Sequence, residues 1–101
     1  MTVAKVIRYK TRPESADENA RLIRDVFAEL AEQQPPGLHY AAFRLDDGVS
    51  FLHVAVTDGA TNPLSSLAAF GKFQAGIQGR CVEGPAVADA AIAGSYQFMP
   101  E

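Results

Sequence analysis

The chain has 101 residues, of which 48% are hydrophobic and 21% are charged, a composition typical of one globular domain over residues 1–101. Its net charge of -3 argues against a nucleic acid or an anionic membrane as the main partner. The single cysteine, Cys81, cannot form an internal disulfide, and no apolar run approaches the ~20 residues that span a bilayer. We therefore expect a protein of the reducing cytoplasm.

The first part of the chain predicts a strand and then a helix. Residues 2–12 alternate loosely between apolar and polar side chains, and a proline follows them. Ser15 and Glu18 have the spacing of a capping box, in which each side chain accepts a hydrogen bond from the backbone N–H of the other. The apolar positions that follow recur at helical spacing: Leu22, Ile23, Val26, Phe27, Leu30 and Ala31. Two prolines and a glycine at 35–37 then end the helix near residue 33.

Residues 38–58 predict a β-hairpin around Asp46, Asp47 and Gly48. We favour a two-residue type I′ turn at Asp47-Gly48; a type I turn with a bulge at Gly48 is the alternative. With Asp46 opposite Val49, the side chains divide into two faces. One face carries His39, Ala41, Phe43, Leu45, Ser50, Leu52, Val54 and Val56, and the other carries Leu38, Tyr40, Ala42, Arg44, Phe51, His53, Ala55 and Thr57. Both faces are mainly apolar, so both should be covered.

The stretch after the hairpin predicts a loop and a second helix. Residues 59–63 form the loop, in which Asn62 caps the helix and Pro63 lies in its first turn. Apolar residues continue at helical spacing from Leu64 to Ile77. Glycines within this stretch weaken the helix, and we expect a break near Gly71.

A last strand is expected over residues 90–98, after an interruption at Gly84-Pro85. The order strand, helix, strand, strand, helix, strand predicts an α+β fold, the ferredoxin-like βαββαβ sandwich, with a four-stranded antiparallel sheet and both helices on one face. We assign the face of His39 to the helices. The other face would pack against a second copy, so that a homodimer forms a dimeric α/β barrel, and its residues are Leu38, Tyr40, Ala42, Phe51 and Ala55.

Four short motifs resemble the dimeric α/β-barrel superfamily, and specifically its antibiotic-biosynthesis-monooxygenase-like (ABM-like) domains. They are VIRYKTRPES at 6–15, Val56-Thr57-Asp58 at the hairpin end, Lys72-Phe73-Gln74-Ala75, which is similar to an HFQAF-like segment, and Gly94-Ser95-Tyr96. The resemblance implies a homodimer with a pocket between sheet and helices. Some members of the family oxidise quinols or polyketides without a cofactor, and others degrade heme.

The chain departs from the heme-degrading members of this family. That branch carries an Asn, a Trp and a His at positions that align with Ile7, Val56 and Ile77. These apolar side chains cannot ligate iron or hold oxygen by a hydrogen bond. Two histidines and one cysteine, at 39, 53 and 81, also lack the spacing of a metal site. We therefore expect no metal and no cofactor.

A cofactor-free oxygenase needs a base that deprotonates a phenol or quinol, and hydrogen-bond donors for the oxygen-derived anion. The polar candidates are His39, His53, Tyr9, Tyr40, Tyr96, Arg8 and Arg44. We predict His39 as the catalytic residue, because it is assigned to the helix-facing side and a histidine titrates near neutral pH. A rim or core histidine bonded to backbone carbonyls is the alternative for His39. His53 is expected in the dimer interface.

The residues predicted to bind an apolar or aromatic ligand are Tyr9, Phe43, Val54, Val56, Phe73 and Ile77. Two functions remain open at this point. The first is a cofactor-independent monooxygenase that acts on an aromatic or quinoid molecule in a pocket between sheet and helices. The second is a non-catalytic homodimer that binds a small apolar ligand or a partner. A cavity with a convergent His or Tyr favours the first function, and a packed core favours the second.

Overall fold

The computed structural model describes residues 3–58 and 63–97 of the chain. The elements in chain order are β1 (Val3–Thr11), the 3-10 helix η1 (Pro13–Ser15), α1 (Ala16–Gln33), β2 (Leu38–Arg44), β3 (Ser50–Thr57), the 3-10 helix η2 (Pro63–Ser66), α2 (Ala68–Ala75), α3 (Ile77–Arg80) and β4 (Cys81–Ala90). No helix in these two ranges is both long and apolar enough to cross a membrane.

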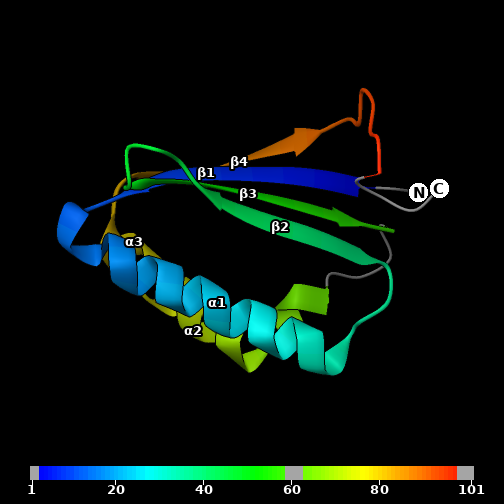
Figure 1. Cartoon of the computed structure of the whole chain (residues 1–101), viewed down its shortest axis with the longest axis horizontal. Helices are drawn as coiled ribbons and strands as arrows, with labels where there is room; N and C mark the ends of the chain where they lie inside the picture. Colours follow the sequence, from blue (N-terminus) through cyan, green and yellow to red (C-terminus); the bar gives the residue numbers. More distant parts are fainter. Residues whose placement is uncertain (1–2, 59–62, 98–101) are drawn as a thin grey trace.

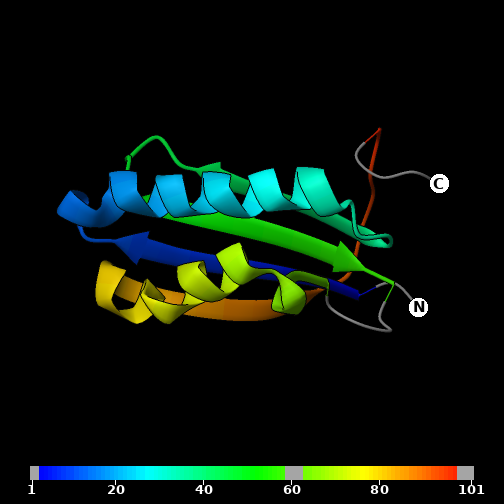
Figure 2. The same cartoon turned by 90° about the horizontal axis from the view of Figure 1, so that it is seen from below.

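The strands form one antiparallel sheet in the order β2-β3-β1-β4. All the helices lie on one face of this sheet (Figure 1), and α1 and α2 run side by side across it in the turned view (Figure 2). This arrangement is the ferredoxin-like sandwich, so the predicted α+β fold is confirmed. The core between the layers consists of Tyr9, Val26, Phe51, Leu64, Leu67, Phe73 and Ile77.

The opposite side of the sheet, which we call the open face, carries no described helix. Its side chains include Ala4, Val6, His39, Val54 and Val56. After β4 the chain turns back over this face (Figure 1), and residues 91–97 belong to no helix or strand. The open face is therefore covered only in part.

The hairpin of β2 and β3 has the predicted register, with Arg44 opposite Phe51, but its two faces are the reverse of our assignment. Tyr40 and His53 lie on the helix side, where they contact aromatic rings of α1 and α2, and His39 lies on the open face. Apolar content could not distinguish the faces. The polar groups of the helix side bond to each other, so they can be buried without an unsatisfied group.

We predicted that the face of Tyr40 and Phe51 lacks helices and meets a second copy. The helices cover that face instead. Leu38, Tyr40, Phe51 and Ala55 all pack into or against the core beneath the helices. A partner that covers the sheet would contact the His39 side.

The hairpin turn is the alternative form, not the favoured type I′ turn. Gly48 has a φ of 80°, whereas Asp47 has no positive φ, and type I′ requires it at both central residues. The Gly48 N–H donates to the Leu45 carbonyl at 3.0 Å. The Asp47 carboxylate accepts hydrogen bonds from the N–H groups of Val49 and Ser50 at 3.0 and 2.8 Å. These two bonds fix the backbone at the start of β3.

The first helix ends at Gln33, as predicted, because Gln34 adopts a left-handed conformation and donates its N–H to the Leu30 carbonyl at 2.8 Å. The predicted capping box is wrong, since the Ser15 side chain makes no capping hydrogen bond. Ser15 has a φ of -103° and a ψ of -5°, because η1 leads directly into the helix. A capping side chain normally needs extended backbone at this position.

The second helical segment breaks at Gly76, between α2 and α3, and not near Gly71, which lies inside α2. A Cβ at Gly76 would approach Arg80 Nη1 to 2.7 Å, so the glycine leaves room for the guanidinium. Pro63 begins η2, as expected for a proline in a first turn. The predicted cap at Asn62 lies outside the described residues.

The last strand covers residues 81–90, so the predicted strand at 90–98 is wrong from residue 91 to residue 97, and Phe98 lies outside the described residues. Gly84-Pro85 is part of the strand. A proline fits there because β4 is an edge strand and loses no ladder hydrogen bond on its outer side. Gly84 has a φ of 81°, and a Cβ would lie 2.8 Å from the Arg8 carbonyl oxygen. This close approach of β4 to β1 explains the glycine.

Candidate functional site

Five polar side chains from five different elements meet between the sheet and the helices. They are Tyr9 of β1, Asn19 of α1, Tyr40 of β2, His53 of β3 and Arg80 of α3. Asn19 is 0% exposed, Tyr9 2%, His53 3% and Arg80 7%. Polar groups this deeply buried are costly unless they are paired, so their arrangement is specified by the fold.

The five side chains form one continuous hydrogen-bonded chain. Arg80 Nε donates to Asn19 Oδ1 at 2.9 Å, and Asn19 Nδ2 donates to the Tyr9 hydroxyl at 2.9 Å. Tyr9 Oη lies 2.8 Å from His53 Nε2, and Tyr40 Oη lies 2.6 Å from His53 Nδ1. We call this set the Arg80–Tyr40 chain.

The direction of every bond in the Arg80–Tyr40 chain follows from the donors available. A guanidinium can only donate, so Asn19 must turn its carbonyl to Arg80 and its amide N–H to Tyr9. The Tyr9 oxygen then accepts from Asn19, and its own proton goes to His53 Nε2. His53 carries its proton on Nδ1 and donates it to Tyr40.

The reverse direction would leave a buried proton without an acceptor. If His53 donated from Nε2, the Tyr9 oxygen would accept two hydrogen bonds and its hydroxyl proton would have no acceptor among the described residues. Leaving such a donor unsatisfied in the core costs about 1–3 kcal/mol. The chain therefore runs from Arg80 to Tyr40.

Burial also shifts the pKa values of His53, Tyr9 and Tyr40 so that all three side chains are neutral at pH 7. Burial lowers the pKa of His53 to about 4, so its ring is neutral at pH 7 and Nε2 can accept. Burial also raises the pKa of the Tyr9 and Tyr40 hydroxyls above the ordinary value, so both stay protonated. The chain therefore works as a set of neutral donors fixed by one cation, and it is not a base near neutral pH.

Aromatic rings enclose the Arg80–Tyr40 chain. Tyr9 stacks on Phe51 with ring centroids 5.4 Å apart, and the His53 ring lies 5.5 Å from that of Phe73. The Arg80 guanidinium lies over the Phe73 ring at 5.1 Å, and its Nη2 donates to the Phe73 carbonyl at 2.8 Å. Within residues 3–58 and 63–97, every buried side-chain polar atom has a hydrogen-bond partner. The centre is packed and its polar groups are satisfied.

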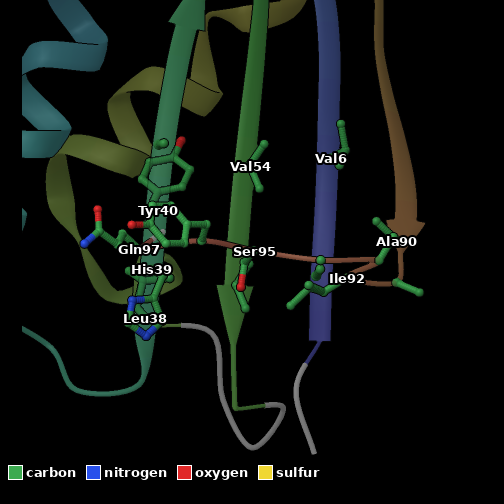
Figure 3. Close-up of a pocket in the computed structure, with 16 residues that line it drawn as sticks. Val6, Leu38, His39, Tyr40, Val54, Ala90, Ile92, Ser95 and Gln97 are labelled. Atoms are coloured by element: carbon green, nitrogen blue, oxygen red, sulfur yellow. The ribbon is translucent and has the colours of Figure 1, made fainter. Parts of the chain in front are cut away.

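A cavity of about 1010 Å³ lies on the open face, separate from the Arg80–Tyr40 chain. His39 of β2, Val54 of β3 and Val6 of β1 lie on its sheet side, and the chain after β4, with Ile92 and Ser95, passes over it (Figure 3). Its lining is mainly apolar. Because the sheet lies between them, the cavity and the buried polar chain are on opposite sides of the strands.

The residues predicted from the sequence divide between these two places. His39, Val54 and Val56 line the open-face cavity. Tyr9, Phe73 and Ile77 belong to the core under the helices. Phe43 is 43% exposed and lines neither site. The structure therefore does not bring the six predicted binding residues and His39 into one pocket.

Two members of the buried chain, Asn19 and Arg80, were missed. Asn19 lies on the same helical stripe as Ile23, Val26 and Leu30, so a polar residue on an apolar stripe was the available signal. Arg80 gave no such signal, because the periodicity after Gly76 was too short to define a face. No group of three potential metal ligands occurs in the part of the chain that the structure describes.

Comparison with solved structures places this geometry among known folds. A candidate antibiotic biosynthesis monooxygenase from Nitrosomonas europaea superposes with a TM-score of 0.74 at 7% identity, over 91% of this chain and 90% of that one. A second, from Caulobacter crescentus, gives 0.72 at 16% identity, over 92% and 91%. The cofactor-independent oxygenase SnoaB from Streptomyces nogalater gives 0.66 at 16% identity, over 93% and 95%. The chain has the ABM-like fold.

The ABM-like resemblance found in the sequence is thus confirmed at the level of the fold, and it covers nearly the whole chain. No protein-family model matches the sequence, and no curated protein matches it. The identities of these structural neighbours are too low to transfer an activity. Function must therefore be inferred from this chain's own side chains.

Proposed function

We propose that this ABM-like protein is a homodimeric, cofactor-independent monooxygenase that acts on an aromatic or quinoid small molecule bound between sheet and helices. The observation that supports it is the Arg80–Tyr40 chain, a set of buried donors oriented by a single cation. Clusters of buried groups with perturbed pKa values are typical of functional sites. The likeness to SnoaB, a cofactor-independent oxygenase, adds a structural precedent.

The proposed reaction inserts one oxygen atom of O₂ into an activated ring position. A CH₂ group between two aromatic rings, as in an anthrone, first loses a proton to solvent, because the buried chain holds no base near neutral pH. The carbon then gives up its second hydrogen and becomes C=O with one oxygen atom of O₂, and the other oxygen atom leaves as water, so no external reductant is required. The difficult species is the oxygen-derived anion formed on the way. Donors that are fixed in a site without bulk water stabilise such an anion more than water does, because they need not reorganise. The Tyr40 hydroxyl, at the end of the Arg80–Tyr40 chain, is suited to this donor role because the other members of the chain donate to one another.

The proposed homodimer uses the open face. This face presents Val6, Val54 and other apolar side chains that no described helix covers, and an apolar sheet face of this kind is commonly an interface. A twofold partner that presents the same face would complete the barrel. His39 then lies at the interface and cannot reach the Arg80–Tyr40 chain. The single Cys81 is consistent with a cytoplasmic location.

Oxygen consumption with a panel of dihydroxynaphthalenes and anthrones tests the proposed function. Tyr9→Phe removes one hydroxyl from the middle of the chain and leaves the ring in place. We expect its rate to fall about tenfold, less than the roughly 10²–10³-fold lost with a direct donor to an anion, because Tyr9 donates to His53 and acts only through the chain. His39→Ala should keep the wild-type rate. If His39→Ala loses activity and Tyr9→Phe retains it, the reaction takes place at the open face and the proposed site is wrong.

A second candidate function is a non-catalytic homodimer that binds an apolar ligand. Two observations favour it: the region between sheet and helices is a packed core, and a cavity of about 1010 Å³ lies on the open face. Under this hypothesis the wild type consumes no oxygen with any member of the panel. Ligand binding would then depend on His39 and would be insensitive to Tyr9→Phe.

A further inference from the structure

The outer end of the Arg80–Tyr40 chain coincides with a groove. Tyr40 accepts the last hydrogen bond of the chain from His53, and it also forms part of the groove wall between α1 and β2. The other members of the chain are almost fully buried, whereas Tyr40 is only partly buried. Tyr40 is therefore the point at which the chain can meet a molecule from solution.

The direction of the chain leaves the Tyr40 proton available. Because His53 donates to Tyr40, the Tyr40 oxygen is the acceptor in that bond and its O–H remains a donor. Within the described ranges, His53 is the one hydrogen-bond partner of the Tyr40 hydroxyl. Hydrogen bonds that run in one direction polarise each other, so this terminal donor is strengthened by the donors behind it.

The groove is apolar and is suited to a planar molecule. Its volume is about 340 Å³, and it is lined by Phe27, Leu30, Ala31, Gln34, Pro35, Leu38 and Tyr40. None of the described residues that line it is charged. Phe27 and Tyr40 stack on each other with ring centroids 5.0 Å apart and planes 7° from parallel, so the groove wall includes an aromatic pair whose edges can contact a planar ligand.

We propose that this groove binds a planar aromatic molecule that carries a carbonyl or phenolate oxygen, and that this oxygen accepts a hydrogen bond from Tyr40. The inference deepens the proposed function, on which it rests for its chemistry, by giving the substrate a binding place and a recognised atom. Tyr40 is the donor that contacts the ligand. Tyr9 and His53 act through it, and they are positioning residues.

Titration with two probes of matched shape tests the proposal without any turnover. The probe 2-acetylnaphthalene carries a carbonyl acceptor, and 2-isopropylnaphthalene does not. Tyr40→Phe keeps the ring and its stacking on Phe27 but removes the donor. We expect it to bind the ketone about tenfold more weakly and the hydrocarbon with unchanged affinity. Tyr9→Phe, which breaks the chain behind the donor, should weaken ketone binding about threefold.

Tyr96→Phe is the matched control, because it removes a tyrosine hydroxyl that is on the other side of the sheet and 84% exposed. It should bind both probes as the wild type does. Amide shift changes on ketone binding should centre on Phe27, Leu30 and Ala31, which line the groove and not the open-face cavity. Equal losses for ketone and hydrocarbon in Tyr40→Phe would indicate a structural effect and overturn the proposal. Shift changes centred on His39 and Val54 would also overturn it.

The outcome is separable from that of the proposed function. If ketone binding depends on Tyr40 but no substrate consumes oxygen, the groove is a binding site and the monooxygenase proposal fails. If oxygen is consumed and ketone binding ignores Tyr40, the monooxygenase proposal stands and the assignment of the groove fails.

Discussion

The two faces of the sheet have similar apolar content but different organisation. The helix side buries a directed chain of polar groups among aromatic rings, and each group has a partner. The open face is apolar with little polar structure, and residues 91–97 cover it loosely. Apolar content alone therefore does not identify the core face of a sheet. A polar network that satisfies itself is as strong a sign of a core as an apolar patch is.

The largest expected effect comes from substitutions at two adjacent residues of β3 that lie on opposite faces of the sheet. Ala55 packs against the core on the helix side, and Val54 lies on the open face. Ala55→Asp would bury a charge without a partner and should destabilise the fold by about 4 kcal/mol, measured by urea unfolding. Val54→Asp should keep the monomer folded and dissociate the proposed dimer in gel filtration. Equal unfolding by the two substitutions would remove the distinction between the faces.

Acid should destabilise the helix side specifically. Because burial lowers the pKa of His53 to about 4, the unfolded chain binds a proton near pH 6.5 that the folded chain does not. Stability is therefore full above pH 6.5, falls as the pH drops toward 4, and loses about 3 kcal/mol over that range. Unfolding free energies measured at several pH values give this slope. In His53→Phe the slope should be reduced, and an unchanged slope would exclude His53 as its source.

Loss of the cation that orients the chain should have a smaller effect. Arg80→Met removes the donors to Asn19 Oδ1 and to the Phe73 carbonyl, and methionine still fills much of the space beside Phe73. Two acceptors lose their partner, and part of the cost is recovered because a buried charge is removed. We expect destabilisation of about 2 kcal/mol. A more stable Arg80→Met would show that Arg80 is kept for function alone.

The smallest effect is expected on the open face. Tyr96 is 84% exposed on the segment that crosses the cavity. Tyr96→Ala should change the unfolding free energy by no more than about 0.5 kcal/mol. A loss above about 2 kcal/mol would mean that residues 91–97 are as well packed as the helix side.

The sequence was sufficient for the element order, the hairpin register and the end of the first helix, since these depend on local periodicity and turn residues. It was insufficient for the last strand, because a Gly-Pro pair normally indicates the end of a strand. Here Gly84 and Pro85 lie within β4, which tolerates a proline because it is at the edge of the sheet. It also placed His39 and His53 on the wrong faces. Which face the helices cover is a long-range property, and it depended on the contacts of Asn19 and Arg80, which are far apart in the sequence.

The ring nitrogens of His53 provide the most direct test of the account. Nitrogen chemical shifts in labelled protein at pH 7 distinguish a protonated from a bare ring nitrogen. The directed chain predicts a neutral ring with the proton on Nδ1, facing Tyr40, and a bare Nε2, facing Tyr9, with no titration above pH 5. A proton on Nε2, or a ring that becomes charged between pH 6 and 7, would contradict the direction of the chain and the donor role of Tyr40.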